Sequence, residues 1–350
     1  MPTIVEELMH SVTVPEGTKM TAKELQTDQD VRWCPGCGDY SILAQTQRII
    51  PDLGIPKHKM VFVSGIGCSS RFPYYMDTYG IHGIHGRATA IASGIKIARP
   101  DLSVWVVTGD GDGMSIGGNH LIHLLRRNLD IKVLLFNNQI YGLTKGQYSP
   151  TSEHGKVTKS TPYGSIDNPF NPISLALGSG TSFAARTLDR DAKHMQAVLK
   201  KAAAHAGTSF VEIYQNCNVF NDGAFFQFTE KDTKDDTVLF LEHGQPMIFG
   251  KAKDKGIRLN GFTPEIVSLA EGKFSANDLL VHNEKDTTLS FILADMTYKP
   301  HLPRPVGVFL SLERPTYENE LSEQIAAARK KRGHGDITKL FNSGETWIIQ

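Results

Sequence analysis

The sequence predicts an α/β protein with a doubly wound, mostly parallel sheet. Between residues 33 and 215, short runs of β-branched and aromatic residues alternate with longer stretches of helical pattern. Several of the short runs are continuously apolar, such as Val104–Val107 and Val133–Phe136. Such runs are expected where helices cover both faces of a sheet. Strands that alternate with helices are typical of parallel sheets.

The expected elements follow this alternation in order. The predicted strands span Met60–Ser64, Ser103–Thr108, Ile131–Phe136, Phe183–Arg186 and Ser209–Tyr214. The predicted helices span Asp39–Ile49, Ala88–Ala98, Gly118–Arg127, Ile173–Leu177 and Arg190–Ala206. Ligands of such sheets bind beyond the carboxyl ends of the strands. The expected binding loops are therefore those after Ser64, Thr108, Phe136 and Tyr214.

Outside this alternation the pattern is weaker. We expect an N-terminal arm at residues 1–30 and the α/β domain at residues 31–228. Residues 229–350 have a mixed pattern that contains Gly, Asp, Lys and Pro. We expect this C-terminal extension to pack on the core or on a partner subunit.

The composition excludes several classes of protein. The chain has 350 residues, of which 40% are hydrophobic and 21% charged, so it can bury a sizeable core. Lysine plus arginine equals aspartate plus glutamate at 37 each, so no net charge attracts nucleic acid or an anionic membrane. No signal-peptide pattern and no run of about 20 apolar residues occurs. We expect a cytoplasmic protein, in which four reduced cysteines indicate metal binding or catalysis rather than disulfides.

A glycine-rich motif predicts a metal-bridged diphosphate site. Gly109-Asp110-Gly111 follows one strand, and Asn138 follows the next. A strand–helix–strand crossover places Asp110 and Asn138 on neighbouring strand ends. Their oxygens suit Mg²⁺, for which the carbonyl of Ile140 is a candidate third ligand, and glycine lets the backbone approach phosphate closely. The fragment resembles the thiamine diphosphate motif, whereas an isolated Gly-Asp-Gly is more often a plain turn.

The four cysteines form a second constellation. Cys34 and Cys37 belong to a Cys-Pro-Gly-Cys hook, while Cys68 and Cys217 follow predicted strands and share the expected edge with Asp110. Four thiolates can bind either zinc or an iron–sulfur cluster, and buried unrelated thiols are a further alternative. We favour the cluster, because beside thiamine diphosphate it has a use as an electron acceptor.

These motifs, in this order, resemble the β subunits of 2-oxoacid:ferredoxin oxidoreductases, most of all those acting on 2-oxoglutarate. The resemblance covers about Trp33 to Phe228, and the tail that begins at His243 also looks like that subgroup. The motifs that carry it are Cys34-Pro35-Gly36-Cys37-Gly38, Gly65-Ile66-Gly67-Cys68-Ser69-Ser70-Arg71, His85-Gly86-Arg87-Ala88, Gly109-Asp110-Gly111-Asp112 and residues 137–147.

The resemblance implies roles for individual residues. It implies that a [4Fe-4S] cluster is bound by Cys34, Cys37, Cys68 and Cys217, and that Mg²⁺ is held by Asp110, Asn138 and the carbonyl of Ile140. The diphosphate would be held with help from Gly109, Gly111, Asp112 and Thr144, and the thiazolium would lie near Ser69, Ser70 and His85. The catalytic candidates are His85, which alone would more often be structural, and Arg71, which can pair with a substrate carboxylate or simply be solvated.

The implied activity is the oxidative decarboxylation of 2-oxoglutarate with coenzyme A, giving succinyl-CoA and CO₂. Electrons would pass through the cluster to ferredoxin, and the reaction would be reversible as reductive carboxylation. Thiamine diphosphate also needs a glutamate from a pyrimidine-side domain, so the resemblance implies an α subunit and a dimer of αβ heterodimers. The alternatives are the same chemistry on pyruvate or other 2-oxoacids, a non-redox thiamine diphosphate decarboxylase or synthase, and a zinc-stapled structural subunit.

Overall fold

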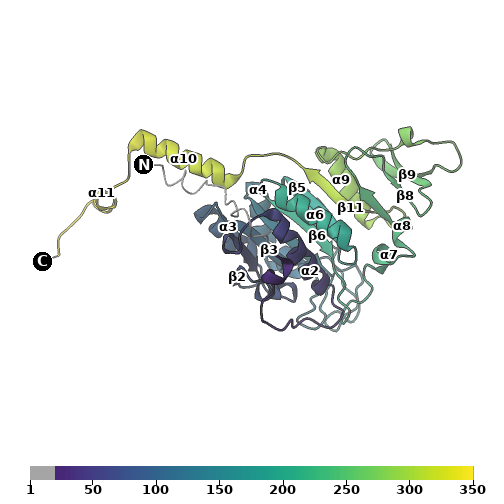
Figure 1. Ribbon diagram of the computed structural model, residues 1–350, viewed down its shortest axis with the longest axis horizontal. Coiled ribbons are helices and arrows are strands. Elements are labelled where there is room, and N and C mark those ends of the chain that lie inside the picture. Colours follow the sequence, from purple (N-terminus) through teal and green to yellow (C-terminus); the bar gives the residue numbers. More distant parts are fainter. Residues whose placement is uncertain (1–19, 350) are drawn as a thin grey trace.

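An eight-stranded sheet forms the centre of the computed structural model, which describes residues 20–349 (Figure 1). Its strand order is β2-β1-β3-β4-β6-β5-β11-β7. The strands are β1 (Met60–Ser64), β2 (Tyr79–His82), β3 (Ser103–Gly109), β4 (Ile131–Asn137), β5 (Phe183–Leu188), β6 (Ser209–Tyr214), β7 (Val238–Leu241) and β11 (Arg304–Ser311). The strands from β2 to β5 pair in parallel, and β11 is antiparallel to β5. The predicted mostly parallel architecture is confirmed.

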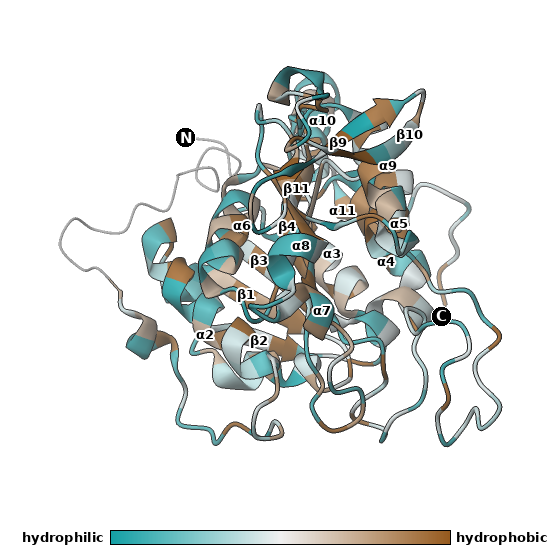
Figure 2. Ribbon diagram, turned by 90° about the vertical axis from the view of Figure 1, so that its right-hand side faces the viewer, coloured by the Kyte–Doolittle hydropathy of each residue, from teal (hydrophilic) through white to brown (hydrophobic). Residues whose placement is uncertain are grey.

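Helices cover both faces of this sheet. One face packs against α2 (Asp39–Ile49) and α6 (Ala192–Ala204). The other packs against α3 (Ala88–Ala98), α4 (Gly118–Arg127), α5 (Pro172–Gly178) and α9 (Thr287–Asp295). Successive side chains of a strand point to opposite faces, and the central strands contribute buried apolar residues to the clusters on both faces. The ribbons of these strands are coloured mainly as hydrophobic in Figure 2.

Five of the ten predicted elements have the expected bounds, three differ by one residue at one or both ends, and β5 and α6 differ by two. Helix α6 begins at Ala192 because Asp191 caps it by accepting from the His194 amide. Strand β2 was not predicted, since all its residues are exposed and form no apolar run. Strands β7 and β11 were not predicted either, because they lie in the segment of mixed pattern.

The segment predicted as a C-terminal extension, residues 229–350, contributes to the main sheet. The boundary at residue 228 lies within α7 (Phe226–Thr229), and the segment after it adds β7 and β11 to the main sheet. A separate antiparallel sheet also follows, formed by β8 (Ile248–Phe249), β9 (Lys255–Asn260) and β10 (Thr263–Ser268). Most of the predicted N-terminal arm, residues 1–19, lies outside the described residues. Its last part contains Leu25, which is fully buried.

The end of the chain leads away from the body of the fold. Helix α10 (Tyr317–Arg332) and the short α11 (Ile337–Phe341) project from it (Figure 1). The buried Glu318 anchors the base of α10 by accepting from the Asp130 amide at 3.1 Å. Exposed apolar side chains along this segment are Ile325, Ile337, Leu340, Phe341, Trp347, Ile348 and Ile349. In the described part of the chain, no helix combines the length and apolar character that crossing a membrane requires.

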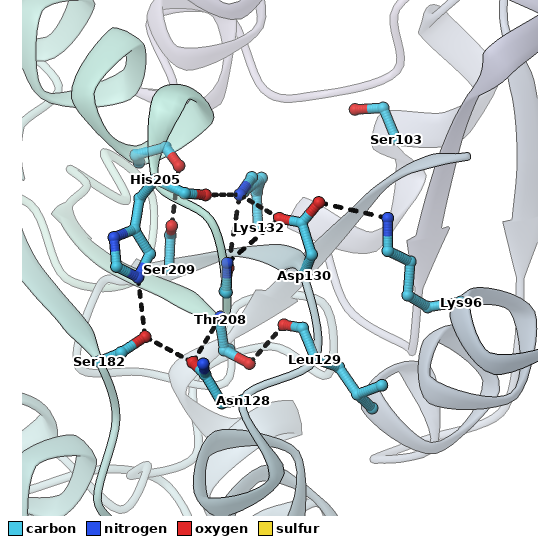
Figure 3. A network of polar contacts seen from close by, with 12 residues as sticks. Lys96, Ser103, Asn128, Leu129, Asp130, Lys132, Ser182, His205, Thr208 and Ser209 are labelled. Carbon is cyan, nitrogen blue, oxygen red and sulfur yellow. Dashed lines mark hydrogen bonds and ion pairs between the residues drawn. The ribbon is translucent and has the colours of Figure 1, made fainter. Parts of the chain in front are cut away.

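A buried polar network joins the amino ends of the strands (Figure 3). Asp130 accepts from Lys96 Nζ at 3.2 Å and from Lys132 Nζ at 2.6 Å. Asn128 Oδ1 accepts from Ser182 Oγ at 2.5 Å and from the Thr208 amide at 3.1 Å. These contacts join the beginnings of β4, β5 and β6, and the buried charges are paired as low-polarity surroundings require. The network therefore fixes neighbouring strands at the edge opposite the predicted binding loops.

Candidate active site

Four neighbouring strands deliver predicted site residues to one edge of the sheet. Strands β1, β3, β4 and β6 lie side by side and run parallel, so that, for example, Asn137 pairs with Tyr214. Their carboxyl ends meet at the same edge. The loops that follow these strands carry Cys68, Asp110, Asn138 and Cys217.

Three adjoining cavities lie at this edge. The Asp110 cavity has a volume of about 80 Å³, the cysteine cavity about 260 Å³ and the Arg71 cavity about 580 Å³. Leu143 lines all three. Cys68, Asn138 and Gly142 line both the Asp110 cavity and the cysteine cavity. These two cavities therefore share one wall.

The Asp110 cavity brings most of the predicted cofactor-binding residues together. They are Ser69, His85, Gly109, Asp110, Gly111, Asp112, Asn138, Ile140 and Thr144. Two predicted residues lie elsewhere. Ser70 is buried, and its hydroxyl has no hydrogen-bond partner within residues 20–349. Arg71 lines the Arg71 cavity and the cysteine cavity instead.

Asp110 is a buried carboxylate with only 2% of its surface exposed. Ser149 Oγ and Thr151 Oγ1 each donate to its Oδ2 at 2.5 Å. Burial nevertheless raises the pKa of Asp110 to about 6, against the effect of these hydrogen bonds. A cation beside the carboxylate would relieve this cost, because an opposite charge favours the ionised form. The position therefore fits a metal ligand.

The turn after β4 has an unusual backbone conformation and forms the cavity wall that carries Asn138 and Ile140. Gln139 has a φ of 56°, which is the left-handed region that non-glycine residues rarely adopt. This turn brings the Ile140 amide to within 3.2 Å of Asn138 Oδ1. Backbone strain of this kind is often found at functional sites. The amide oxygen of Asn138 and the backbone of Ile140 thus lie together at the cavity wall.

Asp112 connects three loops around the cavity. Its Oδ1 accepts from His85 Nδ1 at 2.6 Å, from the Gly86 amide at 2.7 Å and from the Ile66 amide at 3.1 Å. Its Oδ2 accepts from Thr108 Oγ1 at 2.6 Å. The resemblance implied that Asp112 helps hold the diphosphate, and it does line the Asp110 cavity. Its contacts also give it a second, positioning role. Because Nδ1 donates to the carboxylate, the orientation of the imidazole ring is fixed. Nε2 is then the ring nitrogen of His85 that does not contact Asp112.

The glycines of the motif are needed for close packing. A Cβ at Gly111 would lie 2.2 Å from the Tyr141 ring, whose hydroxyl donates to the Gly111 carbonyl at 3.0 Å. A Cβ at Gly65 would lie 2.2 Å from Asp112 Oδ2. Real Cβ atoms do not approach other atoms this closely. At Gly111 and Gly65, glycine therefore leaves room for the side chains of Tyr141 and Asp112. From the sequence alone, glycine was expected to allow the close approach of phosphate instead.

A chain of buried polar contacts supports Asp110 from behind. Thr151 Oγ1 shares its single proton between Asp110 Oδ2 and Asn137 Oδ1, which lies 2.9 Å away. Asn137 Nδ2 in turn donates to Glu212 Oε1 at 2.7 Å. Glu212 Oε2 in turn accepts from Arg186 Nε at 2.7 Å, and both residues of this ion pair are fully buried. Removing either charge would leave the other unpaired in the core. The chain therefore holds the Thr151 hydroxyl in place beneath Asp110.

All four cysteines line the cysteine cavity. Cys34 and Cys37 are close through a tight turn, in which the Cys37 amide donates to the Cys34 carbonyl at 3.0 Å. The Trp33 indole donates to the Cys68 carbonyl at 2.6 Å and so joins this turn to the loop after β1. A Cβ at Gly142 would lie 3.5 Å from Cys217 Sγ and 3.7 Å from Cys68 Sγ. The thiols of Cys68 and Cys217 therefore approach the same point.

The surroundings of the thiols disfavour thiolates in the absence of a positive partner. Burial raises the pKa of Cys68 to about 12, and the neighbouring carboxylate of Asp39 adds to this. Burial and Asp39 also raise the pKa of Cys37 well above its ordinary value. Coordination by a metal reverses such a shift, because it deprotonates the thiol. These thiols therefore fit a metal group better than free, ionised side chains.

The cysteine cavity is larger than a single ion requires. Within residues 20–349, no three His, Cys, Asp or Glu side chains converge as the ligands of one metal ion do. The cysteines surround about 260 Å³ instead, a volume that can hold a group of several atoms. In a [4Fe-4S] cluster, each of four thiolates binds a different iron.

Several residues of the site were missed in the sequence. Ser149, Thr151 and Tyr141 contact Asp110 or Gly111, and Gln215 donates to Cys37 Sγ at 3.2 Å. Tyr141 lies within the predicted motif at residues 137–147, and Gln215 lies two residues before Cys217. The position of Tyr141 and Gln215 in or near these motifs was the one signal in the sequence that could have identified them. Their roles depend on contacts between distant loops.

The comparisons with known proteins extend over the whole described fold. Residues 58–213 match the family model described as thiamine pyrophosphate enzyme, C-terminal TPP binding domain. The chain is 49% identical over 331 residues to the 2-oxoglutarate oxidoreductase subunit KorB of Mycobacterium tuberculosis, covering 93% of this chain and 88% of that relative.

Two further proteins are also similar. The 2-oxoglutarate synthase subunit KorB of Methanocaldococcus jannaschii is 40% identical over 222 residues, which cover 63% of this chain and 80% of the relative. A solved structure of 2-oxoglutarate:ferredoxin oxidoreductase from Magnetococcus marinus, with 2-oxoglutarate, coenzyme A and succinyl-CoA bound, matches with a TM-score of 0.75 and 32% identity. The match covers 96% of this chain and 99% of that one.

The close packing at Gly111 gives a prediction with a matched control. The Gly111→Ala variant should displace the Tyr141 ring, lower the melting temperature and lose the binding of thiamine diphosphate. A Cβ at Gly118 would have no neighbour within 4 Å, so Gly118→Ala should match the natural protein in both properties. Thermal unfolding and fluorescence titration with the cofactor check this. Normal cofactor binding by Gly111→Ala would contradict the packing argument.

Proposed function

The chain belongs to the family of 2-oxoacid:ferredoxin oxidoreductase β subunits, in the group that acts on 2-oxoglutarate, and from this premise we propose how its cavities serve the reaction. The family resemblance predicted from the motifs is confirmed, as is the prediction of an oxidoreductase subunit. We propose that the Asp110 cavity binds Mg²⁺ with thiamine diphosphate and that the cysteine cavity binds a [4Fe-4S] cluster. The observation that carries this proposal is the wall that the two cavities share, which contains Cys68, Asn138 and Gly142.

The ligands proposed for Mg²⁺ are those at the Asp110 cavity. Asp110 offers a buried carboxylate, Asn138 an amide oxygen and Ile140 a backbone carbonyl. Mg²⁺ prefers such oxygen ligands and completes its shell with phosphate and water. The same cavity wall holds the residues proposed to contact the cofactor, which are Ser69, Gly109, Gly111 and Thr144. When bound, thiamine diphosphate supplies the electron sink for decarboxylation.

The protein side chains around the cofactor would mainly orient it and move a proton. His85 is held by Asp112 through Nδ1, so its Nε2 is the atom proposed to exchange a proton with the substrate. Asp112 is proposed as the residue that positions His85. Ser70 is buried and does not line the Asp110 cavity, and we propose that it supports the loop of Ser69.

A [4Fe-4S] cluster explains the cysteine cavity better than zinc does. The two electrons released from a 2-oxoacid must leave singly to reach ferredoxin, and an iron–sulfur cluster carries one electron at a time. Zinc has no redox chemistry and would only join the loops. A non-redox decarboxylase would use the Asp110 cavity but would have no use for four thiols beside it. The volume of the cysteine cavity, about 260 Å³, is also larger than a single ion requires.

The proposed reaction breaks the C1–C2 bond of 2-oxoglutarate and forms the thioester bond of succinyl-CoA. The substrate and coenzyme A give succinyl-CoA, CO₂, one proton and two electrons, and each of two ferredoxins accepts one electron. The same steps in reverse would carboxylate succinyl-CoA at the expense of two reduced ferredoxins. The related structure holds 2-oxoglutarate, coenzyme A and succinyl-CoA, which supports this choice of substrates.

The activity is proposed to require an α subunit. The relatives are named as subunits, which implies a partner. We propose that this partner supplies the glutamate for the pyrimidine ring of the cofactor and that two αβ pairs associate. The projecting segment from α10 to Ile349 is a candidate contact in that assembly, because its apolar side chains are exposed on the single chain.

Arg71 is proposed to select 2-oxoglutarate over pyruvate. Its side chain lines the cavity of about 580 Å³ that adjoins the Asp110 cavity at Ile66, Gly67 and Leu143. A guanidinium there can form a paired hydrogen bond with the distal carboxylate of 2-oxoglutarate. Pyruvate lacks that carboxylate. If Arg71 does not bind the distal carboxylate of 2-oxoglutarate, pyruvate remains the alternative substrate.

Two variants should separate the two proposed cofactor sites. In the complex co-expressed with the α subunit and purified without oxygen, Cys217→Ser should lose iron and ferredoxin reduction but retain thiamine diphosphate. Asp110→Asn should retain iron but lose the cofactor and turnover. Metal analysis, cofactor content and ferredoxin reduction check this. Zinc in place of iron in the natural complex would instead support a structural site.

Substrate selection can be tested with two arginines of the same cavity. Arg71→Gln should raise the KM for 2-oxoglutarate by roughly 10- to 100-fold, as expected for a lost charged hydrogen bond, and change that for pyruvate much less. Arg32 also lines this cavity, but its guanidinium pairs with Asp30 at 3.3 Å. Arg32→Gln should therefore have a smaller effect. An equal rise of KM for both substrates in Arg71→Gln would exclude the proposed selectivity.

A further inference from the structure

Gln215 lies between the two proposed cofactor sites. It directly follows β6, and its backbone amide donates to the Asn137 carbonyl at 2.9 Å, which continues the strand pairing. Its side chain lines the cysteine cavity, yet only 1% of the residue is exposed. A buried amide side chain must have hydrogen-bond partners. Those of Gln215 come from both sites.

The side chain makes one contact with each site and one with the backbone of the next residue, Asn216. Gln215 Oε1 accepts from Asn138 Nδ2 at 2.8 Å. Gln215 Nε2 donates to Cys37 Sγ at 3.2 Å and to the Asn216 carbonyl at 2.6 Å. Among the hydrogen bonds between side chains of residues 20–349, this is the one that a cysteine sulfur accepts. The backbone amide of Asp39 is a second donor to Cys37.

Backbone groups at both ends fix the direction of these hydrogen bonds. The Ile140 amide can only donate, so Asn138 must present its oxygen to it and its Nδ2 to Gln215. The Asn216 carbonyl can only accept, so Gln215 must present Nε2 to it and to the sulfur. Rotating either amide by half a turn would oppose two donors or two acceptors. The sulfur of Cys37 therefore faces an N–H donor.

We propose that Gln215 is a positioning residue shared by the two sites, an inference that rests on the proposed function. Its Oε1 holds the Asn138 amide so that Oδ1 faces the metal position. Its Nε2 donates to the sulfur of Cys37 and raises the reduction potential of the cluster. Hydrogen bonds to the sulfurs favour the reduced cluster because it carries the additional negative charge.

Two substitutions separate these effects. Gln215→Met is similar in size but removes both the acceptor for Asn138 and the donor to sulfur. Gln215→Glu retains an oxygen for Asn138 but replaces the donor. A matched control is Gln47→Met, because Gln47 is also buried, at 5% exposed, and donates to the Tyr75 carbonyl rather than to a sulfur.

The experiment uses the complete complex with the α subunit. Dithionite titration monitored by electron paramagnetic resonance gives the midpoint potential of the cluster. Both Gln215 variants should have a more negative midpoint potential than the natural complex. A tenfold fall in the one-electron equilibrium constant for reduction corresponds to a shift of about 59 mV. Fluorescence titration gives the Mg²⁺ concentration needed for half-saturation with thiamine diphosphate. That concentration should rise about tenfold in Gln215→Met but stay close to the natural value in Gln215→Glu.

The outcomes distinguish this inference from the proposed function. Unchanged potentials in both Gln215 variants, or a magnesium requirement unaffected by Gln215→Met, would overturn the shared role of Gln215 while the cofactor sites stand. If Gln47→Met shifted the midpoint potential or the magnesium requirement as much as the Gln215 variants do, the inference would be overturned as well. Absence of an iron–sulfur signal from the natural complex would overturn the proposed cluster, and the inference with it.

Discussion

The parallel pairing of four adjacent strands is the constraint on which the site depends. Because β1, β3, β4 and β6 run in the same direction and in register, their carboxyl ends meet at one edge of the sheet. The loops there bring together residues from distant parts of the chain, including Cys68 and Cys217. A shift of one strand would move its loop away from the others. The polar network at the opposite edge, around Asp130 and Asn128, helps to prevent such a shift.

Buried polar groups give this edge its chemical character. Asp112 receives four hydrogen bonds and so joins the loops around the cavity. Asp110 and the thiols of Cys37 and Cys68 differ, because burial disfavours their charged forms. Metal ions and clusters stabilise such anions. The unfavourable burial is therefore consistent with binding positively charged groups. Gln215 contacts both positions and links two sites that would otherwise share only a wall.

The sequence could predict the framework of this site but not its contacts. The apolar runs of β1 and β6 and the helical pattern of α2 were sufficient to predict their bounds, because helices cover both faces of the sheet. Strand β2 has no apolar run, and β11 lies in a segment without the alternating pattern, so neither was predicted. Motifs predicted the residues of the Asp110 cavity and the cysteine cavity. The contacts of Asp112 and Gln215 depend on how separate loops pack against one another, which spacing along the chain does not describe.

Electron transfer across the wall shared by the two cavities is the central claim of this account. It is tested most directly by the visible spectrum of the complex, co-purified with its α subunit under anaerobic conditions, before and after 2-oxoglutarate and coenzyme A are added. The account predicts about four irons per β chain and bleaching of the cluster absorption only when both compounds are present. Zinc without iron, or a cluster whose absorption does not change with both compounds present, would contradict it.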